Sequence, residues 1–99
     1  MPPKIAVDHH QIAEICERHH VRKLALFGSV LREDFSADSD VDILVEFEAG
    51  HVPGFSFCDL QDELSAIVGR SVDLHTPASL SRYFRERVLR EAQVQYVAA

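Results

Sequence analysis

A glycine–serine pair, Gly28-Ser29, follows the apolar segment 21–27 and is the first place in the chain where chemistry is expected. Glycine lets a phosphate approach the backbone closely, and the free N–H groups at the start of a helix favour an anion. The Ser29 hydroxyl offers one more donor. The pair is therefore a candidate phosphate cradle, although taken alone it also fits an ordinary turn.

Two carboxylates, Asp40 and Asp42, lie at the start of the segment 41–47 (VDILVEF). Side chains two apart on a strand point to the same side, so these carboxylates repel each other unless a cation or a proton lies between them. Mg²⁺ takes oxygen ligands of this kind and keeps waters and substrate phosphates in the rest of its shell. The alternative is a solvated acidic start of the strand, with Asp40 as a turn residue.

A third carboxylate, Asp73, lies between Val72 and Leu74. Strands disfavour aspartate, so its presence there needs a reason. If this segment lies beside 41–47, Asp73 reaches the same site, where it can bridge a metal ion and accept the proton of an incoming hydroxyl. The alternative is an aspartate satisfied by a helix start near Pro77.

Together the three motifs predict a phosphoryl-transfer site with two Mg²⁺ ions. Such ions neutralise a bound triphosphate and stabilise the attacking and leaving oxygens of an in-line displacement. A P-loop is excluded, because the sequence contains no GxxxxGK[ST] motif.

The elements that must position these residues alternate between helices and strands. Apolar residues at helical spacing follow Asp8, and Gly69 lies where a helix that ends at Val68 needs its cap. Alternating apolar residues predict the strands. The expected order is helix 8–20, strand 21–27, short helix 29–33, loop 34–40, strand 41–47, loop 48–55, helix 56–68, strand 72–75, and a bend and helix over 77–92 with Tyr83, Phe84, Val88 and Leu89 pointing inward. This order predicts an α/β fold, a small mixed sheet with flanking helices.

Composition narrows the class of protein. The chain has 99 residues, of which 46% are hydrophobic, and a net charge of -6. This length predicts one domain, 1–99, and the excess of carboxylates argues against a nucleic-acid partner. The apolar runs are too short to span a membrane, and no apolar signal segment follows the N-terminus, so we expect a cytoplasmic protein. Cys16 and Cys58 have no metal-binding spacing and are expected to be reduced, buried thiols.

The histidines near the N-terminus and the arginines near the C-terminus are expected to be surface residues without a catalytic role. The predicted helix separates the pair His9-His10 from the pair His19-His20 by roughly 15 Å, at about 1.5 Å per residue, so all four are expected at the surface and not at one metal site. The C-terminal arginines favour a solvated helix face, with a partner-docking face and an RNA contact as alternatives. They are Arg82, Arg85, Arg87 and Arg90.

The motifs resemble the signature GSx10DxD of the minimal nucleotidyltransferases, which belong to the polymerase-β-like nucleotidyltransferase superfamily. Gly28-Ser29, a ten-residue spacer and Asp40-Val41-Asp42 carry the resemblance. The segment 72–80 (VDLHTPASL) is similar to the family's VDLVTPxxL stretch. The resemblance therefore extends from 21 to 80, and it implies the nucleotidyltransferase core fold.

The resemblance also implies roles for individual residues. Asp40, Asp42 and Asp73 correspond to the catalytic carboxylates that bind two Mg²⁺ ions. Gly28 and Ser29 correspond to the pair that holds the nucleotide's phosphates, and Arg32 matches a commonly basic position that supports the site or touches phosphate. Two positions depart from the pattern: Glu33 replaces a frequent glycine, and His75 replaces a usually apolar residue.

The short length of the chain limits how it can recognise the molecule that accepts the nucleotide. Larger enzymes of the superfamily recognise the acceptor with an added helical domain, for which 99 residues leave no room. Relatives of this size are typically antitoxins of HEPN toxin–antitoxin modules, so the resemblance implies transfer of AMP from ATP to a tyrosine of a HEPN-domain ribonuclease toxin. The alternatives are a non-catalytic antitoxin that acts by binding alone, and a transferase for a small molecule.

Overall fold

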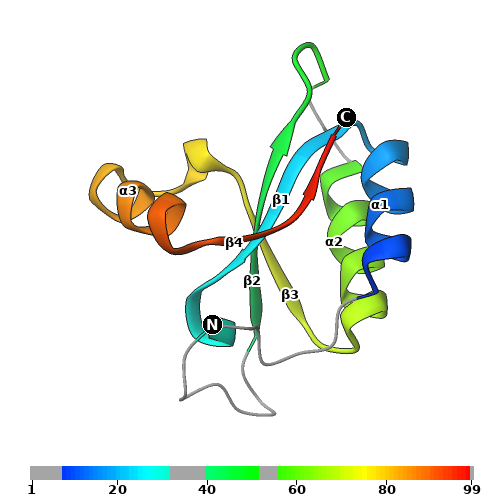
Figure 1. Ribbon diagram of the computed structural model, residues 1–99, viewed down its shortest axis with the longest axis horizontal. Helices are drawn as coiled ribbons and strands as arrows, with labels where there is room; N and C mark the ends of the chain where they lie inside the picture. The colour runs from blue at the N-terminus through cyan, green and yellow to red at the C-terminus, as the bar shows by residue number, and fades with distance from the viewer. Residues whose placement is uncertain (1–7, 32–39, 52–55, 99) are drawn as a thin grey trace.

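The computed structural model describes residues 8–31, 40–51 and 56–98, apart from the side chains at 29 and 30. Helices and strands alternate along the chain, as expected for an α/β protein (Figure 1). The elements are α1 (His9–Arg18), β1 (Val21–Phe27), a 3₁₀ turn (Gly28–Leu31), β2 (Val41–Phe47), α2 (Ser56–Val68), β3 (Val72–His75), a second 3₁₀ turn (Pro77–Ser79), α3 (Arg82–Glu91) and β4 (Gln93–Val97).

The strands form one mixed sheet in the order β3-β2-β1-β4. β1 pairs antiparallel with β2 and with β4, whereas β2 and β3 are parallel. Parallel neighbours need a crossover connection, and α2 lies in the segment that joins β2 to β3. The predicted small mixed sheet with flanking helices is therefore confirmed.

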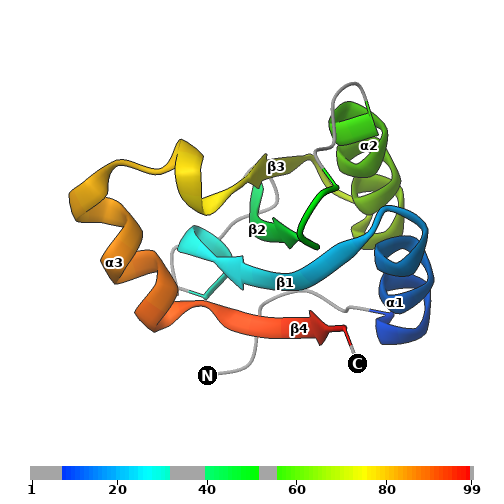
Figure 2. The ribbon, with the colours of Figure 1, turned by 90° about the horizontal axis from the view of Figure 1, so that it is seen from above.

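The two faces of the sheet have different surroundings. Figure 2 shows α1 and α2 together at one side of the sheet and α3 at the other. The larger core lies between the sheet and the first two helices, where Leu24, Ile43 and Leu64 are at most 1% exposed. Successive side chains of a strand point to opposite faces of the sheet. The strand residues that alternate with the core residues therefore face away from α1 and α2. That second face carries the chemically interesting side chains.

Most of the expected elements lie where the sequence pattern predicts them. The strands 21–27, 41–47 and 72–75 and the helix 56–68 have the predicted bounds. The first helix is shorter than 8–20: Asp8 caps it by accepting hydrogen bonds from the backbone N–H groups of His10 and Gln11, and it ends at Arg18. The short helix predicted at 29–33 is the 3₁₀ turn Gly28–Leu31, and most of the predicted loop 34–40 lies outside the described residues.

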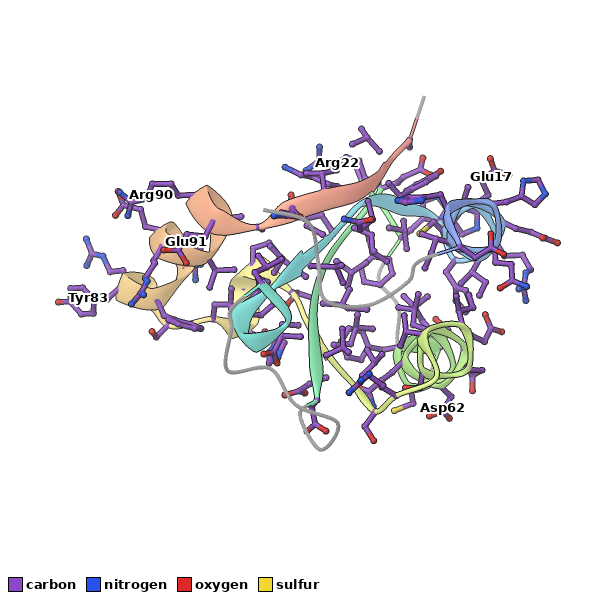
Figure 3. All side chains as sticks on the ribbon, turned by 60° about the horizontal axis from the view of Figure 1, so that its bottom comes forward. Glu17, Arg22, Asp62, Tyr83, Arg90 and Glu91 are labelled. Carbon is purple, nitrogen blue, oxygen red and sulfur yellow. The ribbon has the colours of Figure 1, made fainter. Side chains whose placement is uncertain are left out.

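The prediction for the C-terminal segment is wrong in two respects. The last helix ends at Glu91, and the strand β4 follows it, pairing with β1. Polar residues alternate with apolar ones in QVQYV, and the predicted order ends with the helix at 92 and assigns no element to this short edge strand. Of the four side chains expected to point inward, Val88 alone is buried, and Tyr83 is 89% exposed (Figure 3). The helix touches the sheet along a narrow stripe, since only Val88 and Ala92 join the small cluster with Phe27, Leu44 and Leu80.

The two cysteines differ in burial, which corrects the expectation that both are buried. Both are free thiols, but Cys16 lies on the buried face of α1 whereas Cys58 is exposed on α2. Burial, helped by the charge of Glu17, raises the pKa of Cys16 to about 12. The thiolate is the reactive form, so at pH 8 we expect iodoacetamide to modify Cys58 alone. Intact mass should show one added group on the folded protein and two in urea; two on the folded protein would contradict the burial of Cys16.

Candidate active site

Asp42 and Asp73 lie side by side on the sheet face that α1 and α2 leave uncovered. They are directly paired in the parallel register of β2 with β3. Their strand neighbours Val41, Ile43, Val72 and Leu74 point into the larger core, so alternation turns both aspartates to the opposite face. The structure thus brings together two carboxylates that are separated by 30 residues in the sequence.

Two side chains of α2 hold the strand that carries Asp73. β3 lies at the edge of the sheet, where unpaired N–H groups need a partner. The Leu74 N–H donates to Gln61 Oε1 and the Val72 N–H donates to Ser65 Oγ, each at 3.1 Å. These bonds fix the backbone on both sides of Asp73.

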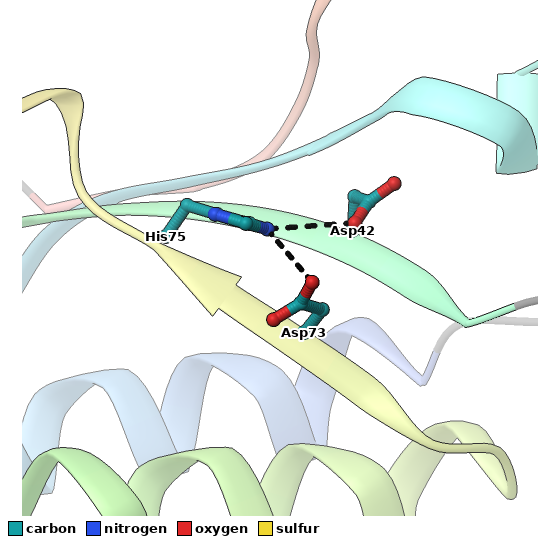
Figure 4. A group of neighbouring side chains, drawn as sticks. All are labelled: Asp42, Asp73 and His75. Carbon is teal, nitrogen blue, oxygen red and sulfur yellow. Dashed lines mark ion pairs between the residues drawn. The ribbon is translucent and has the colours of Figure 1, made fainter. Parts of the chain in front are cut away.

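His75 is the third polar group of the site, and the sequence pattern alone assigns it no role. Its Nε2 atom lies 3.4 Å from Asp42 Oδ1 and 3.3 Å from Asp73 Oδ2 (Figure 4). The edge of the ring meets Phe27, with centroids 5.3 Å apart. One signal for this placement was available, because His75 is two residues from Asp73 and therefore on the same face of β3.

The carboxylates create a strongly negative site. Burial raises the pKa of the Asp42 carboxyl above its usual value, and the charges of Asp73 and Asp40 act in the same direction, while His75 opposes them. The Asp42 side chain is 27% exposed, whereas that of Asp73 is 57% exposed. A partly buried carboxylate beside an accessible one suits a bound cation on the inside and an approaching reactant on the outside.

Gly28 lies directly against Asp42. Phe27 is the register partner of Asp42, so the chain turns away from β1 at the level of that carboxylate. Gly28 has φ of +76°, a left-handed conformation that favours glycine, and a Cβ atom built there would overlap Asp42 Oδ2. The candidate phosphate cradle and the carboxylates are therefore parts of one site.

Three further residues were predicted at the site: Asp40, Ser29 and Arg32. Asp40 is exposed just before β2, and its charge reaches Asp42, but its carboxylate is not among the three groups that converge. The backbone of Ser29 belongs to the first 3₁₀ turn. The Ser29 side chain and the residues Arg32 and Glu33 lie outside the described residues.

A pocket of about 270 Å³ adjoins Gly28 on the side of α3. Arg85 holds the start of this helix, since its guanidinium donates to the carbonyl oxygens of Pro77 (2.6 Å) and Leu80 (3.2 Å). Arg85 is thus a structural residue, whereas Arg87 fits the predicted solvated face and pairs with Glu91. The pocket is lined by Phe27, Gly28, Phe84, Arg87, Val88 and Glu91.

The histidine pairs do not form a metal site within the described part of the chain. His9 contacts Gln95 at 2.8 Å, His19 contacts Glu63 at 3.1 Å, and His20 stacks on His51. Among the described residues, the one group of donors that converges within 4.8 Å is Asp42, Asp73 and His75. No helix in the described ranges has the length and apolar character to cross a membrane.

The donor set of this group fits a divalent cation. Two carboxylate oxygens supply the hard ligands that Mg²⁺ and related ions prefer. The Nε2 atom of His75 is buried and makes no hydrogen bond of good geometry with any described residue. A buried polar atom without a hydrogen bond is costly, and a cation between Nε2 and the carboxylates would give it a direct bond in addition to its ion-pair contacts.

Comparisons with known proteins agree with this chemistry. The profile of the nucleotidyltransferase domain family matches residues 10–95. A protein of Thermococcus cleftensis named protein adenylyltransferase MntA is 43% identical over 79 residues, which cover 79% of this chain and 78% of that protein.

Solved structures show the same architecture. A protein described as a candidate minimal nucleotidyltransferase is 36% identical, with a TM-score of 0.71 over 85% of both chains. A toxin–antitoxin protein solved with AMP-PNP has a TM-score of 0.72 over 93% of this chain and 75% of its own. At 20% identity, the second likeness shows a shared fold alone.

Proposed function

The chain belongs to the nucleotidyltransferase domain family, and we propose that it transfers AMP from ATP to a tyrosine of a HEPN-type ribonuclease toxin and so acts as an antitoxin. The protein adenylyltransferase name of the Thermococcus relative supports a protein acceptor. A toxin partner is supported by a fold neighbour described as an MntA–HepT toxin–antitoxin complex. An enzyme that uses ATP for this purpose is expected to work in the cytoplasm.

The contact between Gly28 and Asp42 is the observation that carries the proposal. Only a residue without a side chain leaves the Asp42 carboxylate uncovered at the turn. A phosphate group that approaches the Gly28 backbone therefore comes within reach of the carboxylates. The site unites the two requirements of nucleotidyl transfer, a place for phosphates and a place for the cations that accompany them.

The proposed roles combine the family resemblance with the position and exposure of the described residues. Gly28, Ser29 and Arg32 bind the phosphates of ATP, as the resemblance implies, and Asp40 and Asp42 provide two of the three carboxylates. Asp73, the more accessible carboxylate of the converging pair, accepts the proton of the tyrosine hydroxyl. The tyrosine oxygen forms a bond to the α-phosphorus, the bond to the β-phosphate oxygen breaks, and pyrophosphate leaves.

Mg²⁺ is the proposed cofactor, held by Asp40, Asp42 and Asp73. When bound, it neutralises the phosphates and stabilises the negative charge that develops on the attacking and leaving oxygens. Asp42 is oriented for this task by β2, and Asp73 by the bonds from α2 to β3.

The test is to co-express the chain with the protein encoded by its neighbouring gene and to measure the partner's intact mass. Wild type should add one or more AMP units, and Asp40→Asn should add none, because the variant lacks one proposed cation ligand. A tight complex without added mass in either case would refute transfer and favour neutralisation by binding alone. Labelled AMP found only on small molecules would refute the protein acceptor.

A further inference from the structure

We propose that His75 is a metal ligand of this site and that its imidazole makes the site prefer Mn²⁺ over Mg²⁺. The inference rests on the proposed use of a divalent cation and names a residue that determines which cation is taken.

The spacing of the donor atoms is the first argument. The Nε2 atom lies 3.4 Å from Asp42 Oδ1 and 3.3 Å from Asp73 Oδ2. Ligand atoms about 2.0–2.2 Å from one ion are separated from each other by about 3 to 3.5 Å. The Nε2 atom thus already has the separation from each carboxylate that a shared ion requires, and all three donor atoms lie within 4.8 Å of one another.

The second argument is that the Nε2 atom of the imidazole is buried and lacks a hydrogen bond within the described part of the chain. The ring is held by its edge contact with Phe27, and Nε2 points between the carboxylates (Figure 4). This atom is buried and has no well-formed hydrogen bond among the described residues. Without a metal ion this nitrogen is buried with two long ion-pair contacts and no hydrogen bond to a described residue, whereas coordination would give it a direct bond.

The chemistry of the donor set leads to the choice of metal. Mg²⁺ selects oxygen ligands and retains its waters, so an imidazole nitrogen adds little to its binding. First-row transition ions accept imidazole together with carboxylates, and Mn²⁺ also suits carboxylate and water ligands. His75 should therefore strengthen Mn²⁺ binding selectively.

Mn²⁺ binding without ATP or a partner protein tests the inference. Electron paramagnetic resonance counts free Mn²⁺ during titration, and Mg²⁺ affinity follows from competition. We expect His75→Gln and His75→Leu to weaken Mn²⁺ binding about tenfold or more, with Mg²⁺ binding nearly unchanged. Spin-echo modulation of bound Mn²⁺ should show a coupled nitrogen in the wild type that is absent from His75→Gln. The control is His10→Gln, an exposed histidine on α1, which should behave as wild type.

An increase in Mn²⁺ affinity on replacing His75 would overturn the inference. If His75 instead occupied the cation's place as a competing positive charge, both variants would bind Mn²⁺ more tightly than wild type. Unchanged Mn²⁺ affinity, or no nitrogen coupling in wild type, would equally reject it. Because nucleotide and partner are absent from this experiment, a failed AMP transfer would reject the proposed function without changing the metal result.

Discussion

Replacing Asp42 with asparagine is expected to abolish nucleotidyl transfer and to leave the fold intact. The substitution keeps the shape of the side chain but removes the charge beside Gly28 and His75. Loss of one group that stabilises developing charge typically lowers kcat by about 10²–10³-fold. Transfer of labelled AMP to the partner measures the effect.

The same variant should be at least as stable as wild type. Burial raises the pKa of the folded Asp42 carboxyl, so the unfolded chain releases this proton more readily than the folded one. The ionised carboxylate therefore lowers stability once the pH rises above its unfolded pKa, which includes neutral pH. Calorimetry should give an unchanged or higher Tm for Asp42→Asn at pH 7.

A matched control separates the site from a general charge effect. Asp62 is exposed on α2, at the face of the molecule away from α3 (Figure 3). Asp62→Asn removes the same charge and should keep wild-type transfer. If Asp42→Asn retained transfer as well, or lost several degrees of Tm, the role assigned to Asp42 would be wrong.

Replacing Gly28 with alanine is the second change with a large expected effect. Its left-handed backbone disfavours any Cβ, at a cost of roughly 1–2 kcal/mol of folding free energy. The added methyl group also meets the Asp42 carboxylate, which must move. A displacement of about 1 Å at a reacting centre can reduce the rate by 10²-fold, so transfer should fall by about that factor or more.

Gly50→Ala is the control for backbone strain. Gly50 has φ of +84°, close to that of Gly28, but a Cβ built there has no neighbour within 4 Å. Urea unfolding should show a similar loss of stability for both variants, while Gly50→Ala keeps full transfer. Equal loss of transfer in both would mean that stability, and not the contact with Asp42, explains the effect of Gly28→Ala.

Local sequence patterns determined the elements of this protein where one signal dominated. Alternating apolar residues defined 21–27 and 41–47, and the amphipathic stripe ended by Gly69 defined 56–68. The types and spacing of Gly28, Ser29, Asp40, Asp42 and Asp73 predicted a phosphoryl-transfer site, and their resemblance to the GSx10DxD signature implied nucleotidyl transfer. Gly28-Ser29 and the pair Asp40/Asp42 are local features of the sequence, whereas the place of Asp73 depended on the expectation that its strand lies beside 41–47.

Tertiary structure decided what depends on register and on distant neighbours. The parallel pairing of β2 with β3 set Asp42 beside Asp73 and made His75 their third neighbour. The spacing of Asp73 and His75 places them on one face of β3 but does not specify which strand lies beside them. β4 exists as a strand because β1 offers it a pairing edge, and a short strand has too weak a pattern of its own. The same packing left Tyr83 exposed, because a helix that meets the sheet along a narrow stripe buries only part of its apolar surface.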